Sequence, residues 1–187
     1  MNVDVYSEPV RALLTPWRDP PLGAGGADGA VGLRLARLDP AAVVGRPIVD
    51  DDAAAACLAG LWLYHGCLDE SHALSQHIAT PDGSFWHGIM HRREGDYGNA
   101  KYWFRRVGEH PAFAPLHVAA RAELPLDAPR ELRALVEAPR WDPYRFVDLC
   151  QAACTGRSDL AAGCIRVQAC EWRTLFDFCF HAAAGHS

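Results

Sequence analysis

The sequence predicts an all-α fold, a single-domain helical bundle that carries an irregular N-terminal arm. Its later part contains successive stretches with helical spacing of apolar residues, bounded by capping residues, glycine or proline. No stretch of any length alternates apolar and polar residues as a half-buried strand does. Half of the 187 residues are hydrophobic and 22% are charged, which is typical of a globular chain.

Residues 1–45 form the predicted arm. Ser7 is expected to cap a short helix that runs to Leu14, with a proline in its first turn. Prolines and glycines between residues 16 and 26 then predict a loop. The stretch Val31–Leu38 fits either a strand or a helix, and the sequence leaves this open. We expect the arm to wrap around the core.

Residues 46–187 form the predicted helical domain, which opens with two long helices. Three aspartates at positions 50–52 suit the positive end of a helix dipole. The first helix is predicted to continue over Leu58–Ile78. A break around Pro81 separates it from a second helix, Ser84–Glu94, and this short connection makes the two helices antiparallel neighbours.

Caps and helix stops predict the remaining elements. Aspartates provide the expected N-caps, an Asp-Pro pair opens one helix, and glycines end several of them. These helices are Tyr97–Val107, Pro111–Leu124, Arg130–Glu137, Tyr144–Thr155 and a last helix from Ser158 to about Ala184.

Histidines gather in the central stretch, where six of the nine lie between residues 65 and 110. Residues three and four apart share a helix face. The first long helix therefore carries one polar stripe and the second carries another, and the two stripes face each other across a polar seam. The stripes are His65, Asp69, His72 and Gln76 on the first helix, and His87, His91 and Glu94 on the second.

The seam predicts a metal site. His87 and His91 at i, i+4 can reach one ion, and His72 can complete three ligands for zinc or iron. Glu94 and Asp69 are candidate oxygen ligands. The zincin pattern HExxH is absent because Gly88 follows His87. Two alternatives stay open: a carboxylate-bridged two-metal site, and a structural seam in which the histidines only donate hydrogen bonds.

The helix that follows predicts an anion clamp. Asn99, Tyr102 and Arg106 share one face, and Lys101 and Arg105 lie beside it. Guanidinium groups bind carboxylates and phosphates through two hydrogen bonds. The alternative is that these cations pair with acidic residues and hold the bundle together.

Glu171 interrupts the apolar face of the last helix, where Val167 and Leu175 place it inward. A buried carboxylate without a partner costs several kcal/mol. We therefore expect Glu171 to be buried and bonded to a residue of the central stretch. The candidate partners are His72, His87, His91, Arg92, Arg105 and Arg106. Glu171 and Asp69 are also the candidate catalytic carboxylates.

Several function classes are disfavoured. The net charge of −5 argues against a nucleic-acid binder, and no apolar run is long enough to span a membrane. Seven cysteines without a CxxC pair, and an N-terminus unlike a signal peptide, favour a reducing cytoplasm. The sequence has no glycine-rich nucleotide loop and no GxSxG nucleophile motif.

The stretch GSFWHGIMHRREGDYGNAKYWFRRVGEHP resembles the core of a family of uncharacterised bacterial and fungal proteins. LDESHALSQ and EWRTLFDFC resemble further parts of the same pattern. The resemblance covers about half of the chain and implies that these segments belong together. It implies no catalytic assignment.

The leading hypothesis is a protein that binds a small polar or anionic molecule in a pocket lined by His, Glu and Arg between helices. A metal ion and hydrolase-type chemistry fit this pocket, although the sequence leaves open whether the protein is an enzyme. The alternative is a non-catalytic helical protein with a structural polar seam and a surface that binds a partner.

Overall fold

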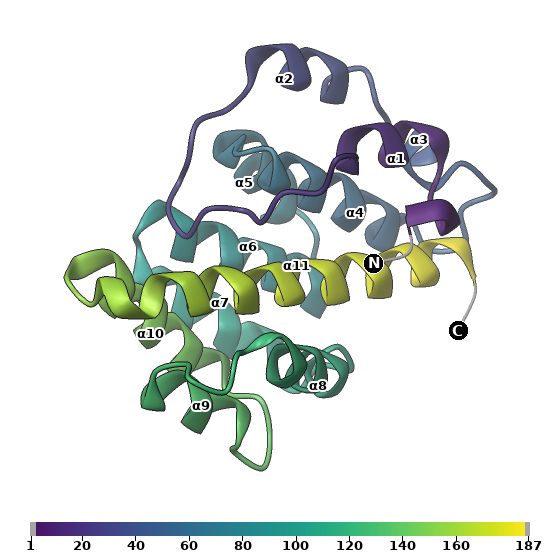
Figure 1. The fold of residues 1–187 in the computed structure, drawn as a ribbon. Coiled ribbons are helices and arrows are strands. Elements are labelled where there is room, and N and C mark those ends of the chain that lie inside the picture. The colour runs from purple at the N-terminus through teal and green to yellow at the C-terminus, as the bar shows by residue number, and fades with distance from the viewer. Residues whose placement is uncertain (1–2, 186–187) are drawn as a thin grey trace.

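The computed structural model describes residues 3–185, and the chain is all-α over that range (Figure 1). Eleven α-helices and two short 3-10 helices are present, with no strand among the described residues. None of the described helices combines the length and apolarity that crossing a bilayer requires. The α-helices are α1 (Glu8–Leu14), α2 (Gly29–Leu35), α3 (Pro40–Val44), α4 (Asp51–Tyr64), α5 (Leu68–Ser75), α6 (Pro81–Glu94), α7 (Tyr97–Val107), α8 (Phe113–Glu123), α9 (Arg130–Val136), α10 (Pro143–Thr155) and α11 (Ala161–Ala184). The predicted all-α single-domain fold is confirmed.

The last helix, α11, runs through the middle of the molecule (Figure 1). Helix α4 packs on one side of α11, and helices α8 and α10 pack on the other. The crossing of α4 over α6 is close, because a Cβ added to Gly60 would lie 2.7 Å from the Trp86 ring. Trp172 of α11 donates a hydrogen bond from Nε1 to the Gly60 carbonyl at 2.9 Å, which joins α11 to α4.

Helix α6 is buried along almost its whole length. The side chain of Thr80 caps it, Pro81 occupies its first turn, and Gly95 ends it with a left-handed φ of 95°. Helices α4, α5, α7 and α10 all pack against it, and residues 83–93 are buried. Because this buried segment contains two histidines and two arginines, each of these polar side chains needs a partner inside the protein.

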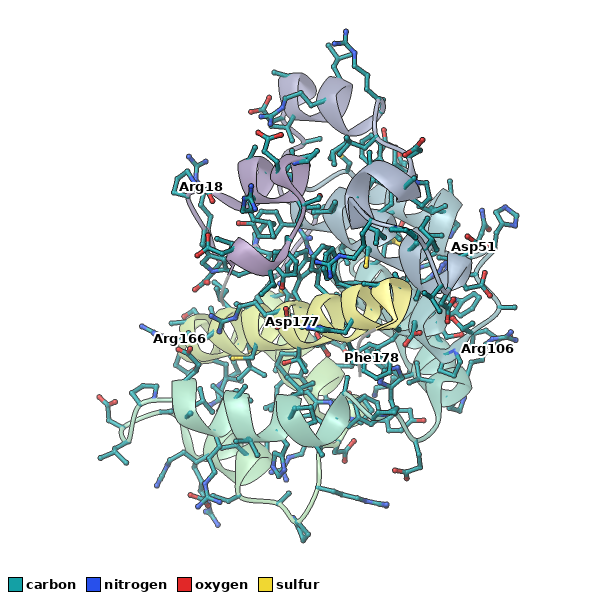
Figure 2. All side chains as sticks on the ribbon, turned by 90° about the vertical axis from the view of Figure 1, so that its right-hand side faces the viewer. Arg18, Asp51, Arg106, Arg166, Asp177 and Phe178 are labelled. Atoms are coloured by element: carbon teal, nitrogen blue, oxygen red, sulfur yellow. The ribbon has the colours of Figure 1, made fainter. Side chains whose placement is uncertain are left out.

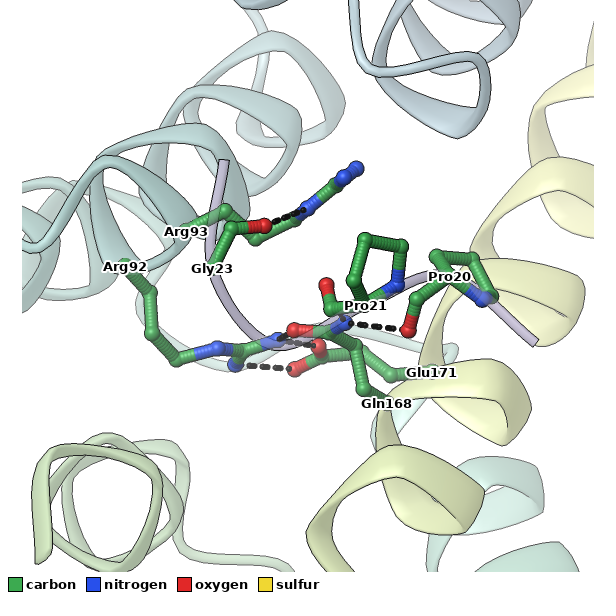
Figure 3. A network of polar contacts seen from close by, with 7 residues as sticks. All are labelled: Pro20, Pro21, Gly23, Arg92, Arg93, Gln168 and Glu171. Carbon is green, nitrogen blue, oxygen red and sulfur yellow. Dashed lines mark hydrogen bonds and ion pairs between the residues drawn. The ribbon is translucent and has the colours of Figure 1, made fainter. Parts of the chain in front are cut away.

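Arg92 and Glu171 form a fully buried ion pair between α6 and α11 (Figure 3). Both carboxylate oxygens of Glu171 accept hydrogen bonds from the guanidinium, and Gln168 accepts another at 3.2 Å. The guanidinium also lies 4.5 Å from the centre of the Phe146 ring of α10. Burial alone lowers the pKa of Arg92, but the charge of Glu171 raises it above its ordinary value. The expected partner of Glu171 is therefore Arg92.

The segment between α1 and α2, residues 15–28, is tied to the core by buried side chains, and we call it the strap. Gln168 donates hydrogen bonds to the carbonyls of Pro20 and Pro21 at 3.1 and 2.9 Å. Arg93 donates to the carbonyl of Gly23 (Figure 3). It also donates to the carbonyls of Ala24 and of Leu63 in α4. Two neighbouring arginines of α6 therefore fix different parts of the fold.

The predicted continuous helix Leu58–Ile78 is wrong. The chain breaks at Gly66, whose φ of 76° belongs to the left-handed region that ends helices, and α5 starts afresh at Leu68. The break turns His65 away from the predicted stripe and toward the strap. Gln76 is exposed at the end of α5.

The arm contains regular structure. The stretch whose type the sequence left open contains helix α2, which Asp28 caps through the backbone N–H groups of Ala30 and Val31. Ser7 does not cap α1, because its hydroxyl donates instead to the carbonyl of Val43 at 2.7 Å. Apolar residues of the arm belong to the main core, and the division at residue 45 remains a prediction.

The ion pair generates a stability prediction. Glu171→Gln leaves the Arg92 guanidinium buried opposite a neutral amide, so we expect the free energy of unfolding to fall by about 3–5 kcal/mol. The double variant Arg92→Met/Glu171→Met removes both charges at similar volume and should lose less than the single variant. Urea unfolding followed by circular dichroism measures both changes.

The control for this series is Glu123→Gln. Glu123 of α8 is the half-exposed ion-pair partner of Arg173, which lies on α11 as Glu171 does. This variant should change the unfolding free energy far less than Glu171→Gln does. A Glu171→Gln protein as stable as the wild type would contradict the anchoring role.

Candidate functional site

Helices α5 and α6 bring His72, His87 and His91 together, and we call these three residues the histidine cluster. The ring centroids lie 4.6 Å apart for His72 and His87, 4.7 Å for His87 and His91, and 5.4 Å for His72 and His91. One ring nitrogen from each residue lies within 4.8 Å of the other two. The predicted convergence of the three histidines is confirmed.

The cluster is nearly sealed on one side and open on the other. His87 is 1% exposed and His91 is 6% exposed, whereas His72 is only partly buried. Ser71 fixes α5 against α4 by donating a hydrogen bond to the carbonyl of Ala59 at 3.0 Å. His72 is therefore the member of the cluster most accessible to solvent.

Hydrogen bonds orient two of the three rings. Nδ1 of His87 lies 2.9 Å from Oγ of Ser75, and Nδ1 of His91 lies 3.0 Å from a carboxylate oxygen of Glu94. A carboxylate accepts, so Nδ1 of His91 carries the proton and Nε2 keeps its lone pair. Asn99 donates its amide to that Nε2 at 3.0 Å. Such Nδ1 partners are typical of histidines whose Nε2 binds a metal.

The two sealed histidines are neutral at pH 7. Burial, together with the neighbouring His91 and His72, lowers the pKa of His87 to about 3. Burial also lowers the pKa of His91, against the opposing effect of Glu94. Neutral imidazole is the form that binds a metal ion, so neither ring has to lose a proton first.

Glu94 does not reach the centre of the cluster as a ligand. Its carboxylate is bonded to Nδ1 of His91 from the outer side, and its side chain is 56% exposed. The predicted role of Glu94 as a metal ligand is thereby corrected to that of a residue that orients His91. An i, i+3 spacing places the two residues on one helix face, but it does not tell a ligand from an orienting partner.

Helix α7 contributes Asn99 and Trp103 to the cluster. The Trp103 ring centroid lies 4.0 Å from that of His87, and the guanidinium of Arg106 lies 5.1 Å from the centre of the Trp103 ring. The sequence analysis did not identify this contact. The position of Trp103, four residues after Asn99 and three before Arg106, is the signal that could have found it.

The other predicted ligand-binding residues of α7 point elsewhere. Lys101 pairs with Asp148 of α10, outside the cluster. Arg105 lies over the exposed ring of Tyr102 at 5.8 Å and does not reach the histidines. Of the three cations predicted for the anion clamp, Arg106 is the one that approaches the cluster, through Trp103.

Neither predicted catalytic carboxylate lies at the cluster. Glu171 is sealed from solvent, and Arg92 occupies both of its oxygens. Asp69 is exposed in the first turn of α5 and has no hydrogen bond or ion pair among the described residues. We assign Glu171 an anchoring role, because a sealed and doubly bonded carboxylate cannot take a proton from a substrate.

Comparisons of this chain with family models, with curated proteins and with solved structures found no match.

Proposed function

We propose that the protein binds one divalent transition-metal ion through His72, His87 and His91. The observation that carries the proposal is the approach of three ring nitrogens to within 4.8 Å of one another. A tetrahedral zinc ion with Zn–N bonds of about 2.0–2.1 Å requires nitrogens roughly 3.3 Å apart. Small side-chain rotations close that difference, because His72 is only partly buried.

Zinc fits this set of ligands better than iron. Three neutral imidazoles match a zinc site that leaves one coordination position open. The common iron triad uses two histidines and one carboxylate, and the nearest carboxylate, Glu94, is turned to Nδ1 of His91.

The open position gives the site its chemistry. A zinc ion bound by three protein ligands lowers the pKa of a bound water to about 7 and produces a nucleophile. The Asn99 amide donates to Nε2 of His91, so binding of an ion by that nitrogen would require the amide to turn away, and the amide could then donate to a molecule at the ion. Arg106 above Trp103 supplies positive charge nearby. A hydrolytic reaction on a small anionic molecule is the function that this arrangement supports best.

The rival function is structural, and one observation favours it. His87 and His91 both have hydrogen-bond partners from the protein itself, so these bonds can hold α5, α6 and α7 together. Metal binding separates the two functions, since a purely structural polar seam takes up no ion.

Metal titration tests the proposal. The purified, chelator-treated protein should bind one equivalent of Zn²⁺ in isothermal titration calorimetry, and His87→Ala should abolish that binding. Glu94→Gln weakens the orientation of His91, so we expect affinity to fall about 10- to 100-fold. His77→Ala is the matched control, because His77 is exposed just beyond α5. Equal binding by wild type and His87→Ala would contradict the site.

The role of Arg106 has its own test. In the Co²⁺-substituted protein, added inorganic phosphate should change the visible spectrum when it reaches the open coordination position. Arg106→Gln should raise the phosphate concentration needed by several-fold, because a nearby positive charge is lost. Arg105→Gln removes the same charge from the adjacent position and should leave the titration unchanged. Identical titrations for both variants would remove Arg106 from the site.

A further inference from the structure

A cavity of about 410 Å³ lies between the N-terminal arm and the core. The strap forms one wall, and residues of α1 and α2 complete that side. Tyr64, His65 and Gly66 at the end of α4, together with Arg93 of α6, form the opposite wall. This volume falls in the range of roughly 300–1,000 Å³ that small-molecule sites occupy.

The cavity is separate from the histidine cluster. Arg93 follows His91 by two residues, so the two side chains leave α6 about 200° apart around the helix axis. Arg18 of the cavity and Arg106 beside the cluster lie on opposite sides of the molecule in Figure 2. Nothing proposed for the metal site involves this cavity.

Buried polar side chains hold the strap in place. Gln168 bonds Pro20 and Pro21, and Arg93 bonds Gly23 (Figure 3). Arg93 also bonds Ala24. Gln168 is 1% exposed and Arg93 is 2% exposed. This wall of the cavity is therefore formed before any ligand arrives, which reduces the entropy lost on binding.

Three arginines and two aspartates line the cavity. Asp19 accepts a hydrogen bond from Nε1 of Trp17, and Asp28 caps α2. Arg93 is bonded to backbone carbonyls. Arg18 and Arg34 are exposed residues at the edge of the cavity, and their guanidiniums have no hydrogen-bond acceptor or ion-pair partner among residues 3–185. Both guanidiniums are therefore free to bind a ligand.

The charges of these two arginines shift the pKa values of two adjacent residues in the opposite wall, Tyr64 and His65. Burial raises the pKa of Tyr64, and Arg18 opposes that rise. Burial lowers the pKa of His65, and Arg34 lowers it further. The Tyr64 hydroxyl accepts a hydrogen bond from the backbone N–H of Arg18 at 2.9 Å. Its own proton has no acceptor within the described part of the chain, so it can be donated to a ligand.

We propose that this cavity binds a small carboxylate or phosphate compound between Arg18, Arg34 and the Tyr64 hydroxyl. Guanidinium groups bind both anions through paired hydrogen bonds, and a phenol adds a further donor. The volume leaves room for the body of a small organic molecule beyond the anionic group.

Calorimetry on the full chain, kept free of metal by chelator, tests this site. The probes are glycerol 3-phosphate and glycerate, with glycerol as the uncharged probe. We expect saturable 1:1 binding of at least one anion and none of glycerol. Arg18→Gln and Arg34→Gln should each weaken binding about 10-fold or more, since each removes a charged hydrogen-bond donor. The tighter of the two anions identifies phosphate or carboxylate as the preferred group.

The matched control is Arg37→Gln, which removes an exposed charge just after α2 and outside the cavity. It should leave the affinity within two-fold of the wild type, as should His87→Ala in the histidine cluster. The proposal is overturned if neither anion binds, or if Arg37→Gln weakens binding as much as Arg34→Gln does.

Discussion

The buried ion pair between Arg92 and Glu171 is the interaction on which the rest of the structure depends. It joins α6 to α11, and the Arg92 guanidinium also packs on a ring of α10. A charge buried without a partner is costly, so the pair permits only one rotation of α6 about its axis. That rotation determines where every other side chain of α6 points.

Three consecutive residues of α6 illustrate this constraint. His91 faces α5 and α7, Arg92 faces α11, and Arg93 faces the strap. Successive helical residues are rotated by about 100°, so one buried helix can support the histidine cluster on one side and the cavity under the strap on another. The helices and the strap around α6 provide a hydrogen-bond partner for each of these three side chains.

Local signals in the sequence predicted much of this arrangement. Asp96 and Gly108 cap the two ends of α7, and both ends were predicted from these residues. The i, i+4 spacing of His87 and His91, with the short connection that precedes α6, predicted the cluster. The burial of Glu171 followed from its apolar neighbours. These features depend on helix geometry and on residues close together in the chain.

Long-range packing decided the features that the sequence did not predict. Gly66 lies within the polar spacing that predicted one continuous helix, and in the structure its φ is positive and it lies close to the Gly26 carbonyl of the strap. Lys101 pairs with Asp148, which lies 47 residues away. The contact of Trp103 with His87 depends on how α7 packs against α6. The cavity forms because the strap packs back against α4 and α6. No local sequence pattern predicts that packing.

X-ray absorption spectroscopy of the zinc-loaded protein tests the central claim most directly, because it reports the atoms bound to the ion. We predict three histidine imidazoles at about 2.0–2.1 Å and one further light-atom ligand. Loss of imidazole scattering in the His72→Ala protein would support the assignment. A first shell without imidazole, or one containing sulfur, would contradict it.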